Sequence, residues 1–101
     1  MKKKQLIQIM LDTIKLTRER CRGEFMEDIP ELGFTHMLGM MTTIHSTDDM
    51  PEDKMERWLG WFQACAVYTT RGGVRMSYLQ EINKKVFEAN KEKVEETHVD
   101  K

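Results

Sequence analysis

The sequence has little of what marks a secreted, membrane-spanning or nucleic-acid-binding protein. Its two cysteines, Cys21 and Cys65, lie far apart and have no Cys or His ligand pattern beside them, so neither a disulfide framework nor a zinc site is expected. No apolar run approaches the roughly 18 to 20 residues that a membrane span requires. Lys and Arg number 16 against 17 Asp and Glu, and this net charge of -1 argues against nucleic acid as a partner.

These absences favour a single domain that stays in the cytoplasm. A chain of 101 residues can bury roughly two-thirds of the surface that its unfolded form exposes, so packing alone can stabilise it without a metal or a cofactor. The basic start at residues 2–4 leads into an amphipathic segment and not into the apolar region of a signal peptide. We therefore expect the protein to remain where it is made.

Apolar residues at intervals of three and four predict the first two helices. The first spans residues 3–22, with its arginines near the end, where positive charge suits the helix dipole, and Gly23 can end it. The second carries an apolar stripe over residues 32–44, interrupted by Gly33 and Gly39.

Two further helices are predicted from their start signals. Asp49 can cap the third helix and Pro51 suits an early helical position, and the helix is expected to end at residue 68 or 69. After a glycine turn at residues 71–73, Ser77 and Gln80 offer a capping box for the fourth. Its expected buried face consists of Leu79, Ile82, Val86 and Phe87.

The predicted fold is all-α: a small bundle of about four helices arranged as two helical hairpins. It forms one domain over residues 1–101, with a core over about residues 3–90 and a charged tail over 91–101 that frays into solvent. We also expect the chain to form a homo-oligomer, because small globular chains commonly assemble with closed symmetry.

The third predicted helix has two distinct faces when each residue advances about 100 degrees. A second stripe on this helix lies outside the core face, and a monomeric surface helix has little reason to carry it. The core face consists of Met55, Trp58, Leu59, Phe62, Cys65 and Ala66, and the second stripe consists of Arg57, Trp61, Ala64 and Tyr68.

Two interpretations of the second stripe involve protein packing alone. In the first, Trp61 and Tyr68 pack under the N-terminal segment of the same chain. In the second, the stripe is a self-complementary subunit interface formed by Gly60, Trp61, Ala64 and Tyr68. Gly60 and Ala64 lack side-chain bulk, so a neighbouring backbone could approach closely.

The third interpretation is a nucleotide pocket, and it is compatible with the second. Arg57 and Arg71 would hold phosphate, Trp61 or Tyr68 would stack on a base, and Gln63 would read a polar base edge. The hydroxyl and glycine residues of the turn at 69–73 could also receive an anion, although the spacing of a phosphate-binding loop is absent.

No grouping typical of an enzyme or a metal site is evident. His36 and His45 are nine positions apart and do not share a helical face as paired ligands would. The acidic residues gathered over 24–31 and 48–53 match the positive end of a helix dipole more simply than they match a cation. The expected protein is not an enzyme.

The segment from Asp53 to Ala64, DKMERWLGWFQA, resembles a group of small uncharacterised tailed-phage proteins. Their shared pattern reads approximately Glu-Lys-x-x-Arg-Trp-Leu-Gly-Phe-x-Gln-Gly. The likeness covers about residues 51–87 and departs at Trp61, where Phe is usual, and at Ala64, where Gly is usual.

The resemblance implies a phage source, in which case the protein would act in the cytoplasm of the host cell. Accessory phage proteins of this size include sponges, which are small helical oligomers that sequester the nucleotide signals of bacterial immunity. By that analogy, the expected function is anti-defence binding of a cyclic or ADP-ribose-type nucleotide. The alternative is a protein-interaction module that inhibits or redirects a host protein through the same stripe or through the methionine-rich second helix.

Overall fold

The computed structural model describes the backbone of residues 2–99 and the side chains of residues 2–89. The regular secondary structure of this part of the chain consists of helices alone, with no strand, so the predicted all-α class is confirmed. Its elements in chain order are α1 (Lys3–Arg20), the short 3-10 helix η1 (Pro30–Leu32), α2 (Phe34–Ser46), α3 (Glu52–Thr69) and α4 (Met76–Val99).

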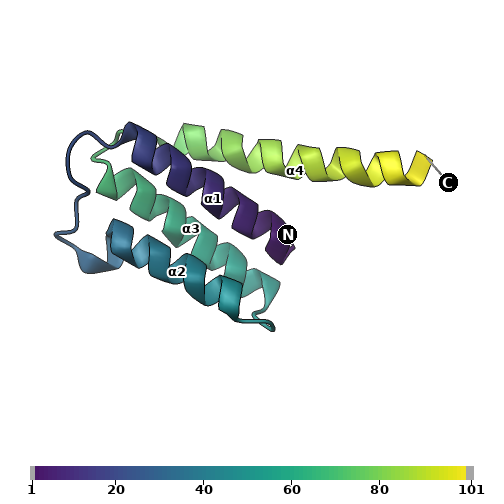
Figure 1. The fold of residues 1–101 in the computed structure, drawn as a ribbon, viewed down its shortest axis with the longest axis horizontal. Helices are drawn as coiled ribbons and strands as arrows, with labels where there is room; N and C mark the ends of the chain where they lie inside the picture. The colour runs from purple at the N-terminus through teal and green to yellow at the C-terminus, as the bar shows by residue number, and fades with distance from the viewer. Residues whose placement is uncertain (1, 100–101) are drawn as a thin grey trace.

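Helix α3 occupies the centre of the bundle. It packs against α1 on one side and α2 on another, and α1 also lies along the first part of α4 (Figure 1). The most extensive pairings therefore join α1 to α3, α1 to α4 and α2 to α3, and do not show the chain as two successive hairpins.

The second half of α4 extends beyond the other three helices (Figure 1). The backbone is helical as far as Val99, and the side chains of the charged tail over 91–101 lie outside the described residues, so the fraying of this tail stays a prediction. Among the helices of the described part, none combines the length and the apolar character needed to cross a membrane.

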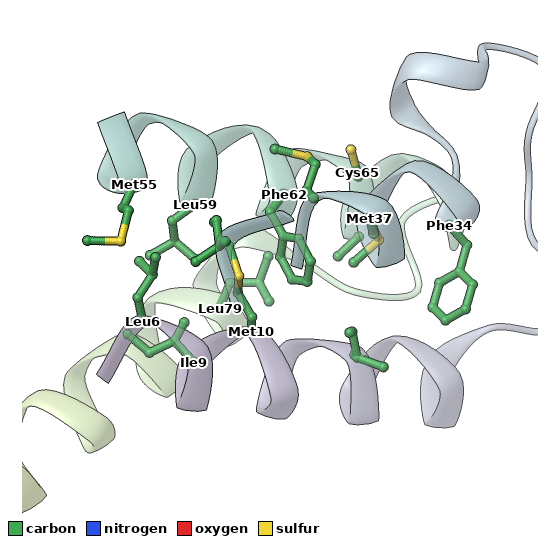
Figure 2. Packing of buried hydrophobic residues seen from close by; sticks show 14 of the residues in the cluster. Leu6, Ile9, Met10, Phe34, Met37, Met55, Leu59, Phe62, Cys65 and Leu79 are labelled. Atoms are coloured by element: carbon green, nitrogen blue, oxygen red, sulfur yellow. The ribbon is translucent and has the colours of Figure 1, made fainter. Parts of the chain in front are cut away.

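The core lies where the inner faces of the helices meet. Figure 2 shows Phe62 of α3 among side chains from α1 and α2, and Phe62 is completely buried. The predicted core face of α3 is confirmed at Met55, Leu59, Phe62, Cys65 and Ala66, all of which are buried. Trp58 is half-buried at the edge of the core.

Three predicted details of the helix ends are wrong. Asp49 does not cap α3, because Pro51 occupies the N-cap position and no side chain bonds to the first turn. Ser77 lies inside α4 instead of capping it, because the helix already begins at Met76. Helix α1 ends at Arg20, before Gly23, since Cys21 adopts an extended backbone.

Phe87 does not belong to the buried face of α4. Its side chain is 56% exposed, whereas Leu79 is buried and Ile82 and Val86 pack partly against the core. Successive residues on a helix are about 100 degrees apart, so Val86 facing inward turns Phe87 away from the core.

Candidate functional site

A groove runs along the surface between α2 and α3, with a volume of about 440 Å³. Its α3 residues recur at intervals of three and four, so they share one face of that helix, and its two α2 residues are four apart. This tryptophan groove is lined by His36, Met40, Lys54, Arg57, Trp58 and Trp61. The chain contains only two tryptophans, and both lie here.

The indole rings are held in place while remaining accessible. Nε1 of Trp61 donates a hydrogen bond of 2.8 Å to the carbonyl oxygen of Glu31, in η1. Trp61 nevertheless stays 48% exposed, and Trp58 is half-buried beside it. Because a flat ring gains most by stacking on an ordered aromatic side chain, this pair offers a surface for a planar ligand.

The charge of the groove is positive. Lys54 and Arg57 are both exposed on α3. The ammonium of Lys54 lies 5.6 Å from the centre of the Trp58 ring, which is within the range of a cation-π contact. Two exposed cations beside accessible aromatic rings suit a ligand that is both anionic and aromatic.

Arg57 and Trp61 are the only two predicted ligand residues that the structure brings into this groove. Tyr68 is half-buried, and its hydroxyl oxygen accepts a 3.1 Å hydrogen bond from the amide of Ile29. Nη1 of Arg71 donates to the carbonyl oxygen of Glu24 at 2.9 Å. Tyr68 and Arg71 therefore hold the loop over residues 21–29 against the end of α3.

Gln63 faces a different neighbour, α4. Its side chain is only 4% exposed, and its amide group exchanges two hydrogen bonds with the amide of Asn83, at 2.8 and 3.3 Å. With donor and acceptor both engaged, Gln63 is not placed to read a ligand in the tryptophan groove.

Of the predicted interface residues, some are exposed on α3 and one is covered by the loop. Gly60, Trp61 and Ala64 are all exposed on α3, and a Cβ atom at Gly60 would meet nothing within 4 Å. Tyr68, in contrast, lies beneath the loop that it supports. The exposed part of the predicted interface is thus limited to the first three residues.

Sequence reasoning missed four residues of the groove. Trp58 was assigned to the core, His36 was considered only as a metal ligand, and Lys54 and Met40 were assigned no role. The spacing of Lys54, Trp58 and Trp61 at i, i+4 and i+7 was a usable signal, since it places all three on one helical face. The contribution of α2 had no such signal, because it depends on how α2 packs against α3.

The thiol of Cys65 lies directly behind the groove. It is completely buried, and its Sγ donates to the same Glu31 carbonyl oxygen at 3.7 Å. Burial raises the pKa of the Cys65 thiol to about 11, so the thiol keeps its proton near neutral pH. Among the described residues, no group of three or more His, Cys, Asp or Glu side chains is placed to bind a metal ion.

No family model matches the chain, and neither a curated protein nor a solved structure matches it.

Proposed function

We propose that this protein is a non-enzymatic binding protein whose tryptophan groove holds a nucleotide. The observation that carries the proposal is the presence of two accessible tryptophans and two exposed cations in one groove. Trp61 or Trp58 would stack on the base, and Arg57 and Lys54 would donate hydrogen bonds to phosphate oxygens. Arg71, Tyr68 and Gln63 are not part of this site.

The biological role that we propose is sequestration of a nucleotide signal by a phage accessory protein in the host cytoplasm. The support for a phage source is the likeness of residues 51–87 to tailed-phage proteins. A groove that binds a nucleotide without transforming it would lower the free concentration of that nucleotide in proportion to the amount of protein.

The tryptophan fluorescence of the chain tests this proposal directly, because both tryptophans line the groove. Adenosine, guanosine and uridine monophosphates would be titrated into the protein with excitation near 295 nm, and calorimetry would confirm the affinity. Because hydrogen bonds to charged groups contribute about 1.5–3 kcal/mol, Arg57→Ala is expected to weaken binding by about 10-fold to 150-fold.

The matched control is Arg75→Ala, which removes the same charge from an exposed position outside the groove. It should bind like the parent protein. The proposal fails if none of the nucleotides binds, or if a folded Arg57→Ala variant binds as tightly as the parent.

We also propose that the protein forms a homo-oligomer through the exposed strip of Gly60, Trp61 and Ala64. Gly60 and Ala64 have little or no side chain and lie on either side of the exposed Trp61. A second helix can therefore approach closely at this strip. Native mass spectrometry at several concentrations would measure the assembly. Ala64→Glu should shift the mass to the monomer, whereas Ala89→Glu, at an exposed position on α4, should not.

A second candidate function is binding of a host protein. The observation that favours it is a separate groove of about 360 Å³ between α1 and α2, lined by Ile7, Leu11, Met41, Thr42, His45 and Ser46. Leu11 is 47% exposed at this groove. The test is a pull-down from host lysate with the parent protein, Leu11→Asp and the control Lys15→Asp. This function is favoured over the first if the parent and Lys15→Asp retain one host protein stoichiometrically, Leu11→Asp loses it, and no nucleotide is bound.

A further inference from the structure

The tryptophan groove continues past His36 into a second depression of about 540 Å³. His36 lines both depressions, so they share one wall on α2. We call this continuation the acidic basin, because it contains the carboxylate of Glu27. It is lined by Glu27, Pro30, Thr35, His36 and Gly39.

The Glu27 carboxylate is held firmly at the start of α2. Its Oε1 accepts a 2.7 Å hydrogen bond from the amide of Thr35. The hydroxyl of Thr35, and then its amide, lower the pKa of Glu27, so this side chain is ionised at neutral pH. A Cβ atom at Gly33 would lie 3.0 Å from Cγ of Glu27, which shows how closely the side chain packs on the backbone.

This placement makes the two ends of the extended groove opposite in charge. The amides at the N-terminus of α2 would otherwise suit a phosphate, but the Glu27 carboxylate already occupies them. Lys54 and Arg57 lie at the other end. A bound nucleotide would therefore place its phosphate beside these cations and not at Glu27.

The length of the groove suits one nucleotide in that direction. Lys54 and Trp61 are seven residues apart on α3, which corresponds to roughly 10 Å along a helix. A phosphate at Lys54 and Arg57 therefore puts the base at the level of Trp61. The outer edge of that base then faces the acidic basin, where Gly39 has no side chain and a Cβ atom would meet nothing within 4 Å.

We propose that Glu27 selects the base, and that the preferred base is guanine. A carboxylate only accepts hydrogen bonds, so it favours a base edge that presents donors and disfavours one that presents acceptors. Guanine presents two adjacent N–H donors, at N1 and at the 2-amino group, which match the two oxygens of a carboxylate. Uracil presents one N–H between two carbonyl oxygens. This inference rests on the proposed nucleotide-binding function and specifies its ligand.

The test compares guanosine, inosine and uridine monophosphates by calorimetry on the full chain. Inosine monophosphate differs from guanosine monophosphate only in lacking the 2-amino group. We expect guanosine monophosphate to bind about 10-fold or more tightly than uridine monophosphate, with inosine monophosphate between them.

Glu27→Gln should bring these affinities within about three-fold of one another, because the amide presents a donor where the carboxylate presents an acceptor. The glutamine oxygen can still accept the Thr35 amide, so the fold should be kept. Glu88→Gln, which makes the same substitution at an exposed site on α4, should leave the preference unchanged.

A second variant tests whether the base enters the acidic basin, by filling the open space there. Gly39→Leu would fill the open space beside Glu27 and should weaken binding of guanosine monophosphate at least 10-fold, whereas Gly39→Ala should weaken it much less. Equal binding of the three nucleotides, or a preference that Glu27→Gln leaves intact, overturns the guanine assignment while nucleotide binding stands. Failure of these three nucleotides and of adenosine monophosphate to bind overturns both proposals.

Discussion

The two ends of one stripe on α3 have different surroundings. Toward the start of the helix, Arg57 and Trp61 line an accessible groove. Toward its end, Tyr68 and the adjoining turn residue Arg71 hold the loop over residues 21–29. Nothing in the helical periodicity distinguishes the two ends. The difference comes from a neighbouring segment that crosses only one of them.

The loop covers the end of α3 because its backbone needs hydrogen-bond partners. Met26 and Thr69 exchange two such bonds, one from the Met26 amide to the Thr69 carbonyl and one from the Thr69 hydroxyl to the Met26 carbonyl, each of 2.9 Å. Buried backbone groups without partners are costly, so these bonds and those of Tyr68 and Arg71 hold the segment in place.

The carbonyl oxygen of Glu31 marks the boundary between the two ends. It accepts hydrogen bonds from Nε1 of Trp61 on the accessible side and from Sγ of Cys65 below. The main chain of η1 is therefore fixed to α3 where the groove begins. The covered end therefore stabilises the fold, while the accessible end stays exposed.

The largest expected effect on stability comes from a substitution in the turn that follows the covered end of α3. A Cβ atom at Gly73 would collide with the carbonyl oxygen of Arg20, a backbone atom that cannot move without displacing the end of α1. Gly73→Ala should lower the free energy of unfolding by about 1–3 kcal/mol, measured by urea denaturation. An unfolding curve that matches the parent would contradict this account of the turn.

The next largest effect distinguishes the covered end from the accessible end, because it should change stability without changing nucleotide affinity. Tyr68→Phe removes the acceptor for the Ile29 amide and should lower stability by about 0.5–1.5 kcal/mol. Because Tyr68 lies outside the tryptophan groove, nucleotide affinity should not change. A variant of normal stability that had lost nucleotide binding would show that Tyr68 belongs to the site after all.

A smaller effect of opposite sign is expected on the accessible end. Gly60 lies inside α3 with open space around the position of a Cβ atom, so alanine brings better helix propensity without a collision. Gly60→Ala should raise the free energy of unfolding of the monomer by roughly 0.5–1 kcal/mol, measured at a concentration too low for assembly. A loss of stability in this measurement would indicate that the position is crowded within a single copy of the chain.

The smallest effect concerns the pH dependence of stability. Because the pKa of Glu27 is lower in the folded protein than in the unfolded chain, its contribution is complete above the unfolded pKa, near 4.5. That contribution is lost as the pH falls through the lower, folded pKa. Glu27→Gln should therefore flatten the acid limb of a plot of melting temperature against pH, whereas Glu88→Gln should leave it unchanged. The effect is small because this carboxylate is exposed.

The parts of the fold that sequence reasoning predicted correctly depend on local periodicity. The buried positions of α3 from Met55 to Ala66 follow from an apolar spacing of three and four, which any partner helix must satisfy. The errors at Asp49 and Ser77 concern helix ends, where several polar residues compete for the same cap. The geometry of the incoming loop decides whether any of them reaches the backbone, and at α3 none does.

The candidate site was predicted only in part for the same reason. Arg57 and Trp61 were found because they share a face of one helix. The contributions of His36 and Met40 depend on α2 packing antiparallel beside that face. The structure places Tyr68 against the loop and Gln63 against α4, outside this groove.

The sequence by itself determined that the chain forms helices, which face of α3 is buried, and that a second, partly aromatic stripe remains. Each of these follows from residue spacing on a single helix, a local property. Only the tertiary structure decided which part of that stripe stays accessible, that His36 and Met40 join it from α2, and that Glu27 continues the groove from a distant loop. Those outcomes depend on contacts between segments far apart in the chain, and no local pattern encodes which segment covers another.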